Sequence, residues 1–175
     1  GTYKTKILPA VKIVEIIKKI NKPVVLLGGP DDVERANEII YGVNSQQSTD
    51  DRHCSQDCSS DSQILNLVGK INLEQSASIV KNADSVLTND TGLMHIAAAF
   101  HKNIVSVWGN TVPELGMYPY LPKEKEKCHI VECKDVKCRP CSKLGFKECP
   151  KKHFRCMMEI DVEEVVKLMD NELYS

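Results

Sequence analysis

The residues best placed to do chemistry lie in the turn from Asn89 to His95. Thr88 ends a short apolar run, and Leu93 begins an alanine-rich stretch with helical character. The first N–H groups of a helix have no partner within the helix and carry a partial positive charge, so they attract anions. Gly92 lets an oxygen approach the backbone, and Thr91 offers a hydroxyl. The spacing therefore predicts a phosphate-binding turn.

Two neighbouring side chains extend this candidate site. His95 follows Thr91 by one helical turn, on the same face, where its ring could donate to the same anion or to a ribose. Asp90 would repel a phosphate, so we expect it to contact sugar hydroxyls. The same residues also fit a plain helix start, with Asp90 or Thr91 as the cap and His95 as an interior histidine. The local pattern leaves both interpretations open.

Such a turn needs a strand before it and a helix after it. Apolar residues at helical spacing, or a capping residue before them, predict helices over residues 9–20, 33–41, 72–81, 93–100 and a last one after Asp161. Asn72 with Gln75, and Asp161 with Glu164, have the capping-box spacing. Short apolar runs predict strands at 23–27, 64–68, 86–88 and 104–108, and an edge strand at 128–131. The first of these reads as a strand buried on both faces.

Strands that alternate with helices require crossover connections, which are right-handed and produce a parallel sheet. The sequence therefore predicts an α/β fold with helices on both faces of the sheet. Ligands of such sheets bind beyond the carboxyl ends of the strands. Three turns become candidates on this ground, at residues 28–32, 69–73 and 89–95.

Length and composition limit the number of domains, the kind of partner and the location of the protein. The chain has 175 residues, of which 42% are hydrophobic, and we expect one domain over residues 1–175. Lys and Arg total 23 against 24 for Asp and Glu, which predicts no nucleic-acid partner and favours a small ligand. No apolar run approaches the roughly 20 residues that span a bilayer. We expect a cytoplasmic protein, at most peripheral to a membrane, with a disordered polar insertion at 44–63.

Five of the eight cysteines lie in a segment from Cys133 to Cys156. Their uneven spacing is unlike a disulfide-stapled small domain and predicts reduced thiols. Cys138 and Cys141 have the spacing of half a zinc site, but Cys149 and Cys156 do not form a second tight pair. No metal is assigned on this evidence. A zinc-stabilised interaction module stays an alternative.

Three stretches together resemble glycosyltransferase family 9, namely Asp90–Ala99, Trp108–Thr111 and Cys138–Cys141. The resemblance extends from Thr2 to about Met158 and covers the carboxyl-terminal half of those enzymes. Members of this bacterial family are ADP-heptose:lipopolysaccharide heptosyltransferases of the two-domain GT-B type. The resemblance implies a Rossmann-like second domain that binds most of the donor, while the first domain, outside this chain, binds the acceptor.

The resemblance also implies roles for single residues. Thr2 and Lys6 would contact the donor diphosphate, and Lys6 would neutralise the charge that develops on the leaving phosphate. Thr91, Gly92 and His95 would form the phosphate-binding helix start. For Lys6, the alternative from the residues alone is an ordinary solvated lysine.

Three further assignments follow from the same resemblance. Asp90 would contact the transferred sugar, which makes it a catalytic candidate together with Lys6. Asp32 would bind the ribose hydroxyls, with Asp31 as an equal candidate. Ile71 would pack on the adenine, although ordinary core packing explains it as well.

The function implied is donor binding in a heptosyltransferase-like enzyme that passes heptose from ADP-heptose to a lipopolysaccharide core acceptor, with no required cofactor. The catalytic base would belong to the acceptor domain, so this chain alone would bind the donor without transferring the sugar. A nucleotide-binding module that does not consume its ligand is the alternative. A dinucleotide oxidoreductase is disfavoured because Gly28–Pro30 is not a G-x-G-x-x-G motif.

Overall fold

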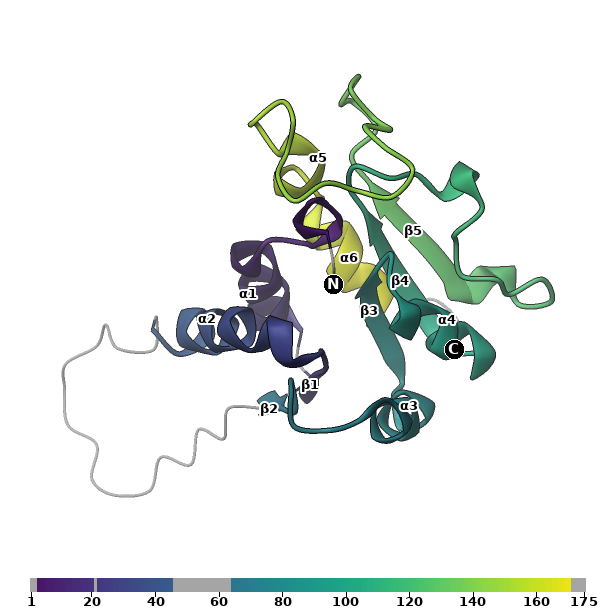
Figure 1. Cartoon of the computed structure of the whole chain (residues 1–175). Helices are drawn as coiled ribbons and strands as arrows, with labels where there is room; N and C mark the ends of the chain where they lie inside the picture. The colour runs from purple at the N-terminus through teal and green to yellow at the C-terminus, as the bar shows by residue number, and fades with distance from the viewer. Residues whose placement is uncertain (1–2, 21, 46–63, 171–175) are drawn as a thin grey trace.

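The computed structural model describes residues 3–20, 22–45 and 64–170, and its strands form two parallel sheets (Figure 1). Thr2 and most of the predicted insertion, residues 46–63, lie outside the described residues. In the smaller sheet β1 (Val24–Leu26) pairs with β2 (Ile64–Asn66). In the larger sheet the central strand is β4 (Asn103–Trp108), which lies between β3 (Ser85–Asn89) and β5 (Cys128–Glu132). Every pairing is parallel, so the predicted fold class is confirmed.

Every α-helix of the described residues except α5 (Arg155–Met158) falls where the sequence predicts one. The others are α1 (Ala10–Lys19), α2 (Val33–Asn44), α3 (Leu73–Asn82), α4 (Gly92–Ala99) and α6 (Val162–Met169). The four-residue helix α5 was not predicted, because one turn is too short to show a period. A 3₁₀ turn, η1 (Lys4–Lys6), precedes α1, and η2 (Pro30–Asp32) leads into α2. Within the described residues no helix is long and apolar enough to cross a membrane.

The predicted capping residues do cap their helices. The Asn72 side chain accepts a hydrogen bond from the backbone N–H of Gln75, and the Gln75 side chain accepts one from the N–H of Asn72, both at 2.9 Å. At the last helix the Asp161 carboxylate accepts from the N–H groups of Glu163 and Glu164. These bonds satisfy donors that a helix start would otherwise leave unpaired.

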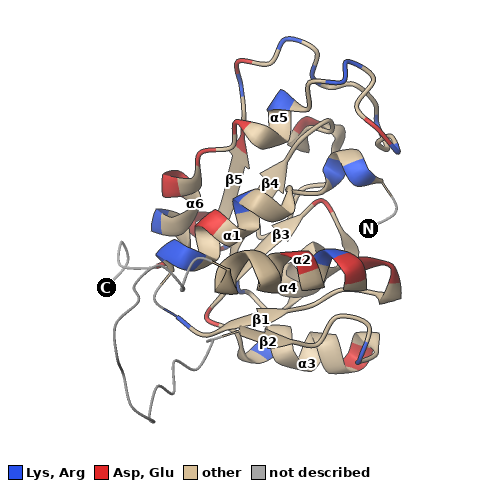
Figure 2. Ribbon diagram, turned by 90° about the vertical axis from the view of Figure 1, so that its left-hand side faces the viewer, with Lys and Arg blue, Asp and Glu red and all other residues tan. Residues whose placement is uncertain are grey.

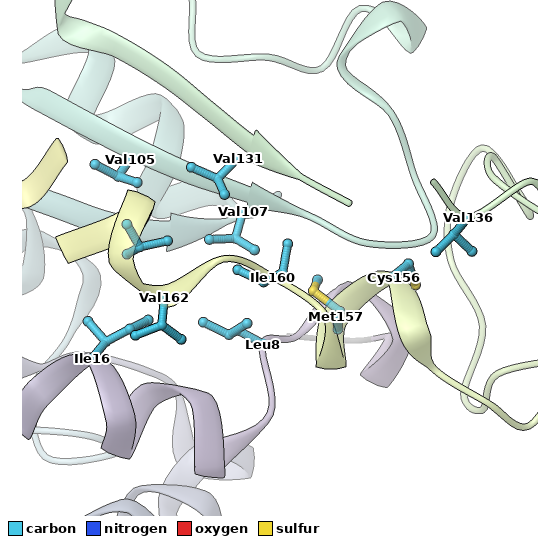
Figure 3. Close-up of a cluster of buried hydrophobic side chains, with 11 residues drawn as sticks. Leu8, Ile16, Val105, Val107, Val131, Val136, Cys156, Met157, Ile160 and Val162 are labelled. Carbon is cyan, nitrogen blue, oxygen red and sulfur yellow. The ribbon is translucent and has the colours of Figure 1, made fainter. Parts of the chain in front are cut away.

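Alternating side chains of β4 build a core on each face of the larger sheet. Val105 and Val107 point to one face, where they pack with Ile16 of α1 and Val162 of α6 (Figure 3). On the other face, Ile104 and Trp108 join a second cluster that includes α4, which in turn contacts α3. All six residues of β4 are buried. Helices therefore cover both faces of this sheet, as predicted.

The prediction that the first strand is buried on both faces is wrong. Val25, at the centre of β1, is 38% exposed. In the described part of the chain β1 pairs with β2 alone, so this two-stranded sheet leaves one side of Val25 uncovered. A short apolar run reads the same for a central strand and for an edge strand, which is why the sequence did not separate them.

Candidate functional site

The turn between β3 and α4 is built as an open helix start. Thr91 is the N-cap residue by backbone conformation, with φ −143° and ψ 169°, yet within the described residues no side chain caps α4. The Thr91 hydroxyl instead lies 3.3 Å from the hydroxyl of Thr88. The interpretation of Asp90 or Thr91 as an ordinary cap is therefore wrong, and the first N–H groups of α4 have no side-chain acceptor in this part of the chain.

The backbone at Gly92 is open on the side where a side chain would lie. Among the described residues outside its own helix turn, a Cβ added at Gly92 would meet no atom within 4 Å. His95, one turn further along α4, is exposed, so it is not the interior histidine of the alternative interpretation. The first turn of α4 thus carries the Thr91 hydroxyl, the backbone N–H groups from Gly92 onward and the exposed imidazole of His95. This arrangement suits an anion with several oxygens.

Lys6 and Asp90 form an ion pair at the edge of this turn. The distance from Lys6 Nζ to Asp90 Oδ2 is 2.6 Å, and the two side chains are 17% and 7% exposed. Thr111, which follows β4, donates its hydroxyl to the same oxygen at 3.3 Å. Lys6 is therefore not the solvated lysine of the alternative interpretation. Its ammonium has three N–H donors, and among the described residues one of them has an ion-pair partner, so the other two can turn toward an incoming group.

Figure 2 shows the basic turn that follows the N-terminus near the end of β3, and the ion pair joins these two segments. Two hydrogen bonds between backbone and side chains hold the segment after Lys6 in place. The N–H of Leu8 donates to the Asn89 side-chain oxygen at 3.0 Å. Arg35 of α2 donates to the carbonyl of Leu8, and burial lowers the pKa of the Arg35 guanidinium while the Asp32 carboxylate opposes that shift. These bonds fix the chain just beyond Lys6.

The turns after β1 and β2 form a second group of candidate residues. The N–H of Gly69 donates to the carbonyl of Gly28 at 3.0 Å, so the two turns lie side by side. The Asp32 carboxylate accepts from the N–H of Gly29 at 3.2 Å, which closes its own turn, whereas Asp31 is exposed. Gly69 has φ +71°, a conformation that favours glycine.

Ile71 follows this pair of turns and precedes α3. It is half-buried, and among the described residues it belongs to neither hydrophobic cluster of the core. Its side chain therefore keeps apolar surface near a turn at the carboxyl end of β2. The structure joins Lys6 directly to Asp90 and places Asp32 and Ile71 in the separate group of turns, while Thr2 lies outside the described residues.

Two residues of this region received no role from the sequence. Thr111 lies just past the end of β4, so the rule that ligands bind beyond strand ends gives a signal for it. Arg139 lies seven residues past the end of β5, beyond the turn that directly follows the strand, so the same rule gives no signal for it. It bonds to the turn after β4, which carries Thr111.

The cysteines raise the question of disulfides or a metal centre. The six cysteines at described positions are free, and burial raises the pKa of Cys156 to about 11, so this thiol stays protonated at neutral pH. Cys138 Sγ lies 3.7 Å from His153 Nε2. No group of three or more His, Cys, Asp or Glu side chains at described positions is arranged to hold a metal ion.

A cavity of about 520 Å³ lies at the other end of the larger sheet, at the amino ends of its strands. It is lined by residues before β3 and β4 and around η4 (Lys125–Lys127), among them Asp84, His101 and Lys102. Ligands of parallel sheets bind at the carboxyl ends of strands, and this cavity lies at the amino ends. We therefore place the candidate site at the turn after β3.

Proteins of known family are similar to this chain in sequence and in fold. Lipopolysaccharide heptosyltransferase 2 of Salmonella typhimurium is 35% identical over 108 residues, which are 62% of this chain and 26% of that protein. The protein of the same name from Escherichia coli is 33% identical over the same shares. The structure of E. coli ADP-heptose LPS heptosyltransferase II matches 95% of this chain and 41% of its own length, with TM-score 0.67 and 22% identity.

The chain thus spans less than half the length of each of these proteins. The family model of glycosyltransferase family 9 (heptosyltransferase) matches residues 2–154, which include η1, the turn after β3 and most of the cysteine-rich segment. The chain belongs to glycosyltransferase family 9, the heptosyltransferase family.

Proposed function

We propose that residues 1–175 form the donor-binding domain of a heptosyltransferase-like glycosyltransferase. The observation that carries the proposal is the uncapped start of α4, open at Gly92 and flanked by the Lys6–Asp90 ion pair. The intact enzyme would transfer heptose from ADP-heptose to a lipopolysaccharide core acceptor. Relatives named lipopolysaccharide heptosyltransferase 2 support this choice of reaction.

In this proposal the donor diphosphate lies on the N-terminus of α4. Its oxygens accept hydrogen bonds from the backbone N–H groups that begin at Gly92, from the Thr91 hydroxyl and from His95. Lys6 adds a charged donor from the side. When the bond between the sugar and the diphosphate breaks, negative charge grows on the departing oxygen. Donors placed there stabilise the transition state more than the bound donor, and this difference accelerates the reaction.

Asp90 has a separate task. Its Oδ2 holds Lys6 and accepts from Thr111, which fixes the ammonium beside the leaving group. Its Oδ1 would accept a hydroxyl of the transferred sugar. The Asp90 carboxylate also balances the charge of the Lys6 ammonium, so the pair carries no net charge before the donor binds.

The nucleoside would extend toward the turns after β1 and β2. Asp32, or Asp31, would accept the ribose hydroxyls, and Ile71 would pack on the adenine. Thr2 would add a donor to the diphosphate. This direction agrees with the unused apolar surface of Ile71.

The acceptor and the base that deprotonates it would belong to a part of the enzyme outside this chain. We propose that the chain binds the donor without transferring it, needs no further cofactor, and works in the cytoplasm, at most peripheral to the membrane. The partial coverage of its relatives supports a division of labour between two domains.

Calorimetric titration of the chain with ADP, ADP-heptose, UDP and GDP tests the proposal. We expect the two adenine ligands to bind most tightly. Thr91→Ala and His95→Ala should each weaken ADP binding by about tenfold, the loss expected from one hydrogen bond to a charged group. Ser78→Ala, which removes an exposed hydroxyl from α3, serves as the control and should change nothing.

Two results would contradict the proposal. Equal affinity for all four ligands would remove the preference for an adenine donor. Unchanged affinity in Thr91→Ala and His95→Ala would remove the turn from the site. Tight ADP binding with a much weaker affinity for ADP-heptose would favour the alternative of a nucleotide-binding module that does not use the sugar.

A further inference from the structure

We propose that Arg139 is a positioning residue of the donor site, which acts through Thr111 and Asp90 on Lys6. The inference rests on the proposed function and adds a residue to which nothing above gives a role in the reaction. Arg139 comes from the cysteine-rich segment, in the Cys138–Cys141 stretch, and touches neither Lys6 nor Asp90 directly.

The Arg139 guanidinium binds the backbone of the turn that follows β4. Its Nε donates to the carbonyl of Gly109, and its Nη2 lies 3.2 Å from the carbonyls of both Trp108 and Thr111. One side chain thus gathers three carbonyls of a four-residue turn. Trp108, Gly109 and Thr111 are all buried, so these carbonyls depend on partners within the protein.

The buried charge of Arg139 is balanced by an ion pair with a carboxylate. Glu132, the last residue of β5, accepts from Nη2 at 2.8 Å, and the two side chains are 6% and 15% exposed. Nη1 donates to the carbonyl of Cys133 at 2.8 Å. The ion pair offsets the cost of burying the guanidinium, and the bond to Cys133 ties it to the chain that leaves β5.

The turn depends on contacts to its backbone more than on its own side chains. Asn110, in its centre, is 2% exposed, and among the residues that the structure places neither Oδ1 nor Nδ2 has a hydrogen-bond partner. Its carbonyl accepts from the N–H of Cys141 at 2.9 Å. The backbone bonds to Arg139 and Cys141 therefore hold the turn, and both come from the cysteine-rich segment.

Close packing around Gly109 also limits any movement of the turn after β4. A Cβ added at Gly109 would lie 2.7 Å from Met157 Cε and 2.9 Å from the carbonyl oxygen of Thr5. Thr5 is also bonded to the cysteine-rich segment, since its hydroxyl donates to the carbonyl of Phe146 and accepts from the N–H of Phe146. The segment thus holds the turn after β4 and the 3₁₀ turn of Lys6 in one arrangement.

From Arg139 the contacts lead into the site in two steps. The guanidinium fixes the backbone of Thr111, and the Thr111 hydroxyl donates to Asp90 Oδ2. The same oxygen accepts from Lys6. A displaced Thr111 removes one bond from Asp90, and the ammonium of Lys6 then loses its fixed position beside the diphosphate.

Lysine cannot replace arginine in this position. The planar guanidinium presents its N–H donors in a fixed fork. Nε and Nη1 each reach one carbonyl, and the two N–H groups of Nη2 are shared among two carbonyls and the Glu132 carboxylate. An ammonium keeps the charge for Glu132 but has three donors at a single atom. Arg139→Lys therefore preserves the ion pair while it releases part of the turn.

Calorimetric ADP titration of Arg139→Lys, at a temperature where circular dichroism shows the chain to be folded, tests the inference. We expect about a tenfold loss of ADP affinity, comparable to one charge-assisted bond. Arg155→Lys is the matched control, because Arg155 lies in the same segment and pairs with Glu159 on the surface. Its ADP affinity should equal that of the wild type.

A double-mutant cycle with Thr111→Val separates positioning from mere stability. Thr111→Val removes the hydroxyl that reaches Asp90 and keeps the side-chain shape. If Arg139 acts through Thr111, the loss caused by Arg139→Lys is at least halved in the Thr111→Val chain. A purely structural role would make the two losses add.

The outcomes also separate this inference from the proposed function. If the wild type binds ADP but Arg139→Lys binds it equally well, or the two losses add, the inference is wrong and the proposed function stands. If the wild type binds no ADP, both fall. If Arg139→Lys does not fold, Thr111→Val and Glu132→Gln take its place, and unchanged ADP affinity in both overturns the inference.

Discussion

Replacing Lys6 with methionine is expected to weaken ADP binding by about 10- to 100-fold, because the diphosphate loses its one charged donor at this edge. Methionine keeps the length of the side chain and removes only the ammonium. The loss is measured by calorimetric titration with ADP and with adenosine. Adenosine has no phosphate, so its weaker binding should be the same in both chains.

The same substitution is expected to lower the free energy of unfolding. Asp90 is only 7% exposed, and without Lys6 its Oδ2 keeps just the Thr111 hydroxyl. A nearly buried carboxylate that loses its cation costs about 1–3 kcal/mol, or more if water cannot reach it. Adding Asp90→Asn to Lys6→Met should restore most of the stability in urea denaturation, but not the ADP affinity.

Lys4→Met is the control for both measurements, because Lys4 lies in the same 3₁₀ turn and is exposed. Its stability and ADP affinity should match the wild type. A Lys6→Met chain that binds ADP as tightly as the Lys4→Met chain would show that Lys6 has no part in binding the diphosphate. The ion pair with Asp90 would then be structural only.

Trp108→Ala is expected to cost about 3–5 kcal/mol of the free energy of unfolding, the usual range for an aromatic side chain removed from a core. Trp108 is 1% exposed and packs in the cluster with α4. Its indole N–H donates to the Ser106 hydroxyl at 3.0 Å, so the substitution also leaves that buried hydroxyl without its donor. Urea denaturation followed by circular dichroism measures the loss.

Trp108→Phe is the matched variant, since it keeps most of the apolar volume and removes the indole N–H. We expect it to cost clearly less than Trp108→Ala. Trp108 also begins the turn that Arg139 holds, so the alanine variant should lose ADP affinity even where it is folded. A cost below about 1 kcal/mol for Trp108→Ala would contradict the packing of this core.

Local patterns were enough to predict most of the fold. The capping box of Asn72 and Gln75 and the strand Asn103–Trp108 are each set by residues close in sequence, so propensity and spacing identify them. The exposure of Val25 depends on which strands pair with β1. That is a property of the assembled sheets, which the short apolar run does not contain.

Some features of the candidate site are also set by local sequence, whereas others depend on contacts between residues far apart in the chain. The turn at Thr91 and Gly92 is local, so its sequence predicts a helix start after a strand, although it leaves open whether a side chain caps that start. The bond between Lys6 and Asp90 joins residues 84 positions apart, and that between Arg139 and Thr111 joins residues 28 apart. The family resemblance put Lys6 and Asp90 in one site, but no spacing rule states that they touch. Arg139 lies in one of the stretches that carry the family resemblance, but neither that resemblance nor any spacing rule gives it a role or a partner.

The most direct test of donor binding is an NMR titration of the ¹⁵N-labelled chain with ADP. We expect the backbone amides of Thr91, Gly92 and Leu93 to shift first and most. Amides around the cavity at the other end of the larger sheet, such as those of Asp84 and Lys102, should stay in place. Shifts confined to that cavity, or no shift at the start of α4 at millimolar ADP, would contradict the claim that this turn binds a nucleotide-sugar donor.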